Sequence, residues 1–268
     1  MLLEIFKDAF EYSYKDTDSI FKLGILSLLS MIFVFPIFLV TGYYYRVTEI
    51  GVNGTINGDD PLPKFENWLE MFIQGFKILF VRFIYLLPGI LIFIIVSAIL
   101  WVPFGLQFAT VPSVVMGPSL EKLIFSLVLF QLGVLSLSAI LSIALYLFST
   151  VAVTNMVNNN GSLTAAFNFK EISNIIESIG FVRYIKFYLG CIVLGIGIFG
   201  SALLAIALIS SAMSFVTYLI TNSETYSAIV GGPISGILAI IVILSVIPFF
   251  ITFESRAIAL IYNMRELD

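Results

Sequence analysis

The chain has 268 residues, of which 60% are hydrophobic and only 11% are charged, and its mean hydropathy is +1.08. A soluble domain carries about 25% charged residues because it must solvate its surface, so this composition excludes an ordinary soluble protein. The formal net charge is −4. The sequence therefore gives no support for a nucleic-acid partner, which would require a clustered basic footprint.

Five apolar segments are long enough to cross a bilayer as helices, since about 20 residues cover roughly 30 Å of hydrocarbon. Their cores contain no Asp, Glu, Lys or Arg. Each such charge would cost about 2.5–3.5 kcal/mol at the bilayer centre on insertion scales. The sequence therefore predicts an all-α, polytopic helical membrane protein. The expected spans are about Leu23–Tyr45, Phe83–Val102, Leu123–Val153, Tyr184–Leu208 and Ile234–Phe253.

The first apolar segment follows an acidic stretch, whereas a signal peptide would begin with a short basic region. We therefore expect this segment to be retained. It contains Pro36, which can kink a helix. Two arrangements remain open for it, a kinked span and a re-entrant segment that turns at Pro36.

Two polar-apolar segments between the spans have helical spacing, and both are too polar to cross a bilayer. We expect them to lie flat in the membrane interface, where Trp68 suits the headgroup level. The alternative is that their apolar faces pack on the protein's own spans. Residues 2–10 form a weaker third case. The apolar positions are Phe65, Trp68, Leu69, Phe72, Ile73 and Phe76 in the first segment, and Ile172, Ile175, Ile176 and Ile179 in the second.

These segments belong to an expected internal repeat within a single integral membrane domain, residues 1–268. The repeat-like units cover about 20–103 and 120–220, and a final span follows at about 234–256. Each unit contains an Asn-Gly turn, an amphipathic segment, a Gly-Phe pair, basic residues and the next span. The matching pairs are Asn57-Gly58 with Asn160-Gly161, and Gly75-Phe76 with Gly180-Phe181. Residues 252–256 resemble the start of a truncated third copy.

Basic residues predict the orientation, because Lys and Arg accumulate on the cytoplasmic side. The connections Pro103–Ser119 and Thr221–Pro233 contain no Lys or Arg, whereas the other loops and the C-terminal tail are basic. We therefore expect a cell-membrane protein with a cytoplasmic C-terminus. Five spans would place the N-terminus outside, although Lys7, Lys15 and Lys22 favour the inside. A re-entrant first segment would remove that conflict.

Catalytic chemistry finds little support in this sequence. There is no histidine and only one cysteine, Cys191, so Ser-His-Asp, Cys-His, zinc and iron–sulfur sites are excluded within the single chain. The GxGxxG match at residues 195–200 lies inside a span and indicates helix packing. Asp59-Asp60 is typical of a solvated turn, with divalent-cation binding as the alternative. We expect a non-enzymatic protein without a cofactor.

Charged pairs mark equivalent span ends in the repeat, Arg46 with Glu49 in the first copy and Glu254 with Arg256 in the truncated third copy. Snorkelling at the membrane boundary explains such charges. The sharper alternative is a polar site between repeats that binds a lipid headgroup or a small anion through Arg46 and Arg256. The full set of candidate lipid-headgroup or interface residues is Arg46, Glu49, Trp68, Phe72, Lys77, Arg82, Arg183, Glu254 and Arg256.

Several motifs resemble a known family. The run Gly42–Val47 is followed by Leu62–Trp68 and Phe72–Lys77, and residues 165–169 and 253–257 are similar to later motifs of the family. Over roughly Tyr12 to Arg265 the chain resembles the mostly archaeal membrane proteins called domain of unknown function 4013. The resemblance implies a multi-pass membrane protein without an assigned activity, and it carries over no catalytic residue.

The leading functional hypothesis is a membrane-organising or lipid-interacting protein, or an accessory subunit, with membrane lipids and other membrane subunits as partners. It rests on the position of the distinctive residues at the expected interface. The alternative is a permease or channel for a small, weakly polar solute, which needs a polar path near Gln131 and Ser138. An enzyme that acts on lipids is a third, less supported hypothesis.

Overall fold

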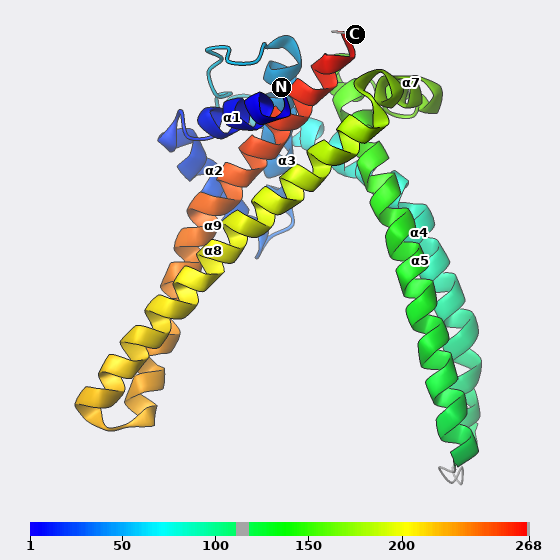
Figure 1. The fold of residues 1–268 in the computed structure, drawn as a ribbon, viewed down its shortest axis with the longest axis vertical. Helices are drawn as coiled ribbons and strands as arrows, with labels where there is room; N and C mark the ends of the chain where they lie inside the picture. The colour runs from blue at the N-terminus through cyan, green and yellow to red at the C-terminus, as the bar shows by residue number, and fades with distance from the viewer. Residues whose placement is uncertain (111–117, 267–268) are drawn as a thin grey trace. The chain divides into compact units, whose positions relative to one another are not determined.

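The computed structural model describes residues 1–110 and 118–266, and these residues form helices and turns without a strand (Figure 1). The all-α fold class is thereby confirmed. The helices are α1 (Leu2–Tyr12), α2 (Thr17–Ser30), α3 (Phe35–Asn53), α4 (Trp68–Thr110), α5 (Pro118–Asn158), α6 (Leu163–Ala166), α7 (Phe169–Ile179), α8 (Phe181–Thr221), α9 (Glu224–Asn263) and the short 3-10 helix η1 (Met264–Glu266).

Four helices among the described residues are long and apolar enough to cross a membrane. These segments are Trp68–Pro103, Glu121–Asn158, Phe181–Thr221 and Glu224–Asn263, with 36, 38, 41 and 40 residues. They contain the second to fifth expected spans and support a polytopic membrane protein. The expected count of five is not confirmed. Of the expected connection at Pro103–Ser119, residues 111–117 lie outside the described part of the chain.

The first expected span, Leu23–Tyr45, is not one continuous helix. α2 ends at Ser30, a turn covers residues 31–34, and α3 begins at Phe35 with Pro36 in its first turn. Proline lacks a backbone N–H and is tolerated at a helix start, so it favours a new helix here over a kink. Gly24 allows α2 to approach the backbone of α9 at Leu244 closely.

The chain separates into two compact units, the first formed by residues 1–79 and 151–268 and the second by residues 80–150. In the first unit, α1 packs on the C-terminal part of α9, where Phe6 stacks on Phe253 with ring centroids 6.2 Å apart. Both chain ends therefore lie at the same end of the α8–α9 hairpin (Figure 1).

The core of the first unit includes aromatic and aliphatic side chains from α1, α2, α3 and the start of α4. The segment Phe65–Phe76 was expected as a separate interfacial helix, but its residues 68–76 are the first turns of the continuous α4. Gly42 on α3 and Gly75 on α4 allow this close approach, because a Cβ at either position would meet backbone atoms of Met71 or Phe38. Phe72 packs between the rings of α3, with centroids 5.0 Å from Phe35 and 4.8 Å from Phe38.

α7 forms the second amphipathic segment, and the structure gives it a different context from the first. It ends at Ile179, and Gly180 with φ 88° separates it from α8. Its face of Ile172, Ile175 and Ile179 is buried. For α7, packing on the protein's own helices thus accounts for much of the apolar face, whereas Trp68, Leu69, Ile73 and Phe76 of the first segment remain exposed.

The second unit is a pair of helix segments from α4 and α5. Gly89 on α4 faces Ser142 on α5 so closely that a Cβ at residue 89 would meet the serine hydroxyl. The side-chain amide of Gln131 donates to Ser97 Oγ at 2.8 Å, and its oxygen accepts from the Trp101 indole at 3.3 Å. Small residues and interhelical hydrogen bonds are the usual means by which helices associate in lipid.

Candidate functional site

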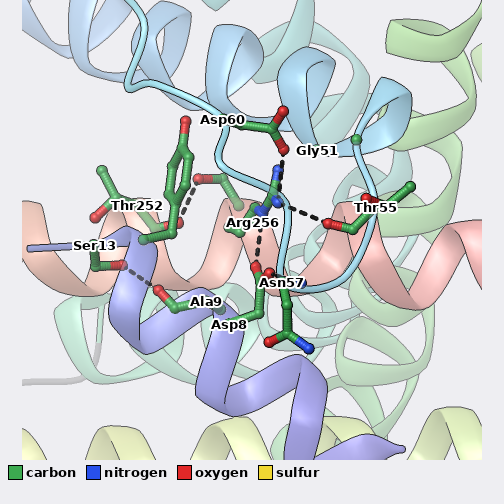
Figure 2. Close-up of polar contacts among 12 residues, drawn as sticks. Asp8, Ala9, Ser13, Gly51, Thr55, Asn57, Asp60, Thr252 and Arg256 are labelled. Carbon is green, nitrogen blue, oxygen red and sulfur yellow. Dashed lines mark hydrogen bonds and ion pairs between the residues drawn. The ribbon is translucent and has the colours of Figure 1, made fainter. Parts of the chain in front are cut away.

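The most concentrated charge cluster lies around Arg256 of α9, whose side chain is completely buried (Figure 2). Its Nε donates to Asp8 Oδ1 of α1 at 2.9 Å, and its Nη2 lies 2.9 Å from Asp60 Oδ2. Nη2 also donates to the carbonyl of Thr55 at 3.2 Å. One guanidinium therefore joins α9, α1 and the loop after α3.

Aromatic and backbone contacts complete this cluster. The Arg256 guanidinium carbon lies 4.8 Å from the centre of the Tyr12 ring, and the Tyr12 hydroxyl donates to the carbonyl of Pro61 at 3.1 Å. The backbone N–H of Asn57 donates to the second carboxylate oxygen of Asp8. Burial raises the pKa of the Tyr12 phenol above its ordinary value, so the phenol stays neutral and remains a hydrogen-bond donor.

Asp59 and Asp60, adjacent in sequence, serve different partners. Asp59 is exposed and pairs with Lys15 at 2.8 Å, whereas Asp60 pairs with Arg256. The Lys15 ammonium holds the pKa of the Asp59 carboxyl below its usual range. The described residues contain no group of three or more His, Cys, Asp or Glu that could hold a metal ion. The geometry thus favours structural ion pairs over the divalent-cation reading.

Other polar side chains bind the carbonyl groups that a helix end leaves without an intrahelical partner. Asn263 on α9 donates to the carbonyls of Gly51, Val52 and Gly54 at the end of α3, at 3.1, 3.0 and 3.2 Å. Lys77 Nζ donates to the carbonyl of Gly161 at 2.9 Å, just after α5. These contacts fix the loops that follow α3 and α5.

Arg46 plays a similar part between α3 and the start of α4. Its Nη1 donates to the carbonyls of Lys64 and Glu66 at 3.0 and 2.6 Å, and its Nη2 donates to that of Asn67 at 3.3 Å. Its Nε donates to Gln74 Oε1 at 3.2 Å. Arg46 thereby holds the loop before α4 against α3.

The residues expected to contact lipid headgroups differ in their contacts in the structure. Arg46, Lys77 and Arg256 bind the protein's own backbone or carboxylates, and Arg256 pairs with Asp8 and Asp60 rather than with its neighbour Glu254. Arg46 and Arg256 contact different parts of the loop between α3 and α4, and the joint site for a headgroup or anion stays a prediction. The remaining expected residues lie as follows: Phe72 in the α3–α4 contact, Trp68 half exposed at the start of α4, Arg82 over the Tyr146 ring at 5.6 Å, Glu254 partly exposed on α9, and Arg183 beside a cavity at the start of α8.

Glu49 lines a surface cavity of about 290 Å³ together with Arg46, Glu70 and Gln74. Burial and the charge of Glu70 raise the pKa of the Glu49 carboxyl above its ordinary value, although the charge of Arg46 opposes them. The Glu49 carboxyl therefore takes up a proton at a higher pH in the folded protein than in the unfolded chain.

We expect Glu49→Gln to raise the melting temperature of the detergent-solubilised protein at pH 7. Since the folded-state pKa of Glu49 lies above the unfolded one, this group's contribution to the free energy of unfolding falls as pH rises through the folded pKa. Below the unfolded pKa the variant and the wild type should melt alike. Equal melting temperatures at pH 7 would contradict this assignment.

Comparison with known families places this chain in a family of unknown function. The family model described as protein of unknown function DUF4013 matches residues 25–206. The chain belongs to this family. No curated protein and no solved structure matches it. The matched region of this DUF4013 protein runs from within α2 to within α8, so it contains Arg46 and the α7–α8 junction but not Arg256.

Proposed function

We propose that this DUF4013 protein is a non-enzymatic membrane protein that interacts with lipids and organises the membrane, or serves as an accessory subunit of a membrane complex. One observation carries the proposal. In the first unit charged contacts gather where α1, the loop after α3 and the C-terminal end of α9 meet, whereas residues 187–221 of α8 contain no charge and expose many apolar side chains. Such an apolar surface is suited to lipid or to another membrane helix.

The orientation that fits this proposal has both chain ends in the cytoplasm. Four spans place the N-terminus and the C-terminus on one side, and the basic residues of the loops and of both terminal segments favour the cytoplasmic side. Cysteine labelling at exposed Lys7 and Lys170, in a Cys191→Ser background, would test this orientation in sealed cells. Labelling of Lys7→Cys by an impermeant reagent from outside would overturn it.

The permease or channel alternative gains little from the second unit. Gln131, a polar residue expected to line a path, uses its amide for Ser97 and Trp101 of the neighbouring helix. The Ser138 hydroxyl donates to the carbonyl of Leu135 at 3.0 Å within its own helix. These groups join or stabilise helices, which favours a lipid-facing or scaffolding role over a solute path.

We expect Gln131→Leu to lower the free energy of unfolding by about 0.6–1.7 kcal/mol, the range for interhelical hydrogen bonds in lipid. The measurement is unfolding in mixed micelles. Ser126→Ala on the same helix is the control, because its exposed hydroxyl binds only its own helix. An altered solute flux in proteoliposomes, rather than altered stability, would support the channel alternative.

The proposal itself is tested by the fluorescence of Trp68, which becomes the only tryptophan in the Trp101→Phe variant. Trp68 is 50% exposed at the start of α4. In vesicles with lipids brominated at different depths, we expect the strongest quenching near the headgroup level, as for interfacial aromatic residues. The reciprocal Trp68→Phe variant reports Trp101 as a control. Emission typical of water with no quenching by any brominated lipid, or conversion of the lipids to products, would overturn the proposal.

A further inference from the structure

A cavity of about 610 Å³ lies at the junction of α7 and α8 in the first unit. The Gly180 turn and the first turns of α8 form one side of it, and Leu2 and Met264 close the other. Gly180 has φ 88°, a backbone conformation that residues other than glycine rarely adopt. The sharp change of direction between α7 and α8 therefore depends on this glycine. The cavity is therefore a built feature of the α7–α8 junction.

Two cations line this cavity from one face of α8. Arg183 and Lys186 are three residues apart, so their side chains emerge on the same side of the helix. Lys186 is exposed and forms no ion pair with any residue that the structure describes. The carboxylate of Glu177 also lines the cavity. The two cations outnumber this acid, so the lining is suited to an anion.

Three other basic residues of the first unit that were expected at the membrane contact the protein itself. Arg46 and Lys77 donate to backbone carbonyls, and Arg256 is buried between two carboxylates. The α7–α8 junction presents two cations beside one cavity, and Lys186 contributes an exposed ammonium group there.

An exposed apolar track begins at the same cations. Phe181 and Val182 are 66% and 65% exposed at the rim of the cavity. Further along α8, Leu189, Val193 and Ile196 continue the face of Lys186 at helical spacing and are exposed as well. They lie within the segment that is apolar enough to cross a membrane. The cationic cavity is suited to a phosphate group, and the adjoining apolar face of α8 is suited to an acyl chain.

We propose that the α7–α8 junction binds an anionic phospholipid, whose phosphate contacts Arg183 and Lys186 while an acyl chain lies along Leu189, Val193 and Ile196 of α8. This inference rests on the proposed lipid-interacting function and names the site and the class of lipid. Juxtamembrane cations attract anionic lipid near the membrane surface. A site with two of them prefers phosphatidylglycerol to phosphatidylcholine.

The test compares lipid retention by native mass spectrometry after delipidation and titration with phosphatidylglycerol, phosphatidylcholine or inorganic phosphate. We expect the Arg183→Gln/Lys186→Gln variant to bind phosphatidylglycerol at least about tenfold more weakly than the wild type. Lys7→Gln/Lys170→Gln removes the same charge from exposed positions outside the cavity and should bind as the wild type does. Equal affinity of the wild type and the Arg183/Lys186 variant would overturn the proposal.

Two further arms keep the outcome decisive. Lys186→Gln alone removes only an exposed side chain, and its melting temperature in phosphatidylcholine should match the wild type, so a weaker affinity cannot be ascribed to misfolding. Inorganic phosphate that competes as well as the lipid would overturn the acyl-chain contact and leave a simple anion site. Interfacial quenching of Trp68 together with unchanged phosphatidylglycerol binding would reject this site while leaving the proposed function intact.

Discussion

Replacing Arg256 with methionine is expected to lower the free energy of unfolding of the first unit by about 3–5 kcal/mol, since removing one partner of a buried ion pair leaves a buried charge uncompensated. Asp8 and Asp60 would both lose their cation, and α1 would lose a polar link to α9 and to the loop after α3. The readout is unfolding in detergent, or loss of folded protein where the variant does not fold.

The two carboxylates should differ in the same experiment. Asp8 has a side chain that is 4% exposed and Asp60 one that is 30% exposed, so Asp8→Asn should destabilise more than Asp60→Asn. Lys7→Gln is the matched control, because Lys7 forms only an exposed pair with Glu11 on the same helix, at 3.8 Å. Such pairs contribute about 0–1 kcal/mol. An Arg256→Met protein as stable as the wild type would disprove the structural role of the cluster.

Substituting alanine for Gly42 or Gly75 should separate α3 from the start of α4. The added methyl group would meet the backbone of Met71 in one case and of Phe38 in the other, and a backbone cannot move aside as a flexible side chain can. Overpacking of this kind costs about 1–3 kcal/mol, and we expect the upper part of that range. Thermal unfolding and protease sensitivity of the loop before α4 would report the loss.

Gly197→Ala is the control for this pair, because nothing lies within 4 Å of a Cβ at residue 197 of α8. Alanine favours a helix over glycine by about 1 kcal/mol, so this variant should be neutral or slightly stabilising. Alanine should lower the stability at residue 75 but leave it unchanged or raise it at residue 197, and this difference distinguishes a packing effect from helix propensity. If alanine at both positions had the same effect, close approach of α3 and α4 would not be the reason for glycine.

The sequence correctly predicted the two Asn-Gly turns. Asn57 and Asn160, expected as turn residues, have φ angles of 60° and 53°, and Gly161 has a φ of 75°. Asparagine and glycine adopt this left-handed conformation more readily than other residues. The same reasoning could not predict whether the helix ends at the Gly-Phe pair that follows each amphipathic segment. Gly75 is helical within α4, whereas Gly180 has a positive φ and ends α7.

The sequence analysis did not predict the ion pairs of Arg256 with Asp8 and Asp60, although the position of Asp8 indicated a buried partner. Asp8 shares a helical face with Ile5, Ala9 and Tyr12, all of which are buried. An acid on the apolar face of an amphipathic helix indicates a buried partner, since an isolated buried carboxylate is unfavourable. Nothing in the local sequence identified that partner as Arg256, which lies 248 residues away along the chain.

The sequence by itself determined the class of this protein, because lipid burial depends on composition and on runs of uncharged residues, which are local properties. It also determined the family, whose model matches residues 25–206. Only the tertiary structure decided which cations remain at the surface. Arg46 and Arg256 resemble Lys186 in sequence context, but partners distant in the chain neutralise or engage the first two and leave Lys186 exposed beside a cavity.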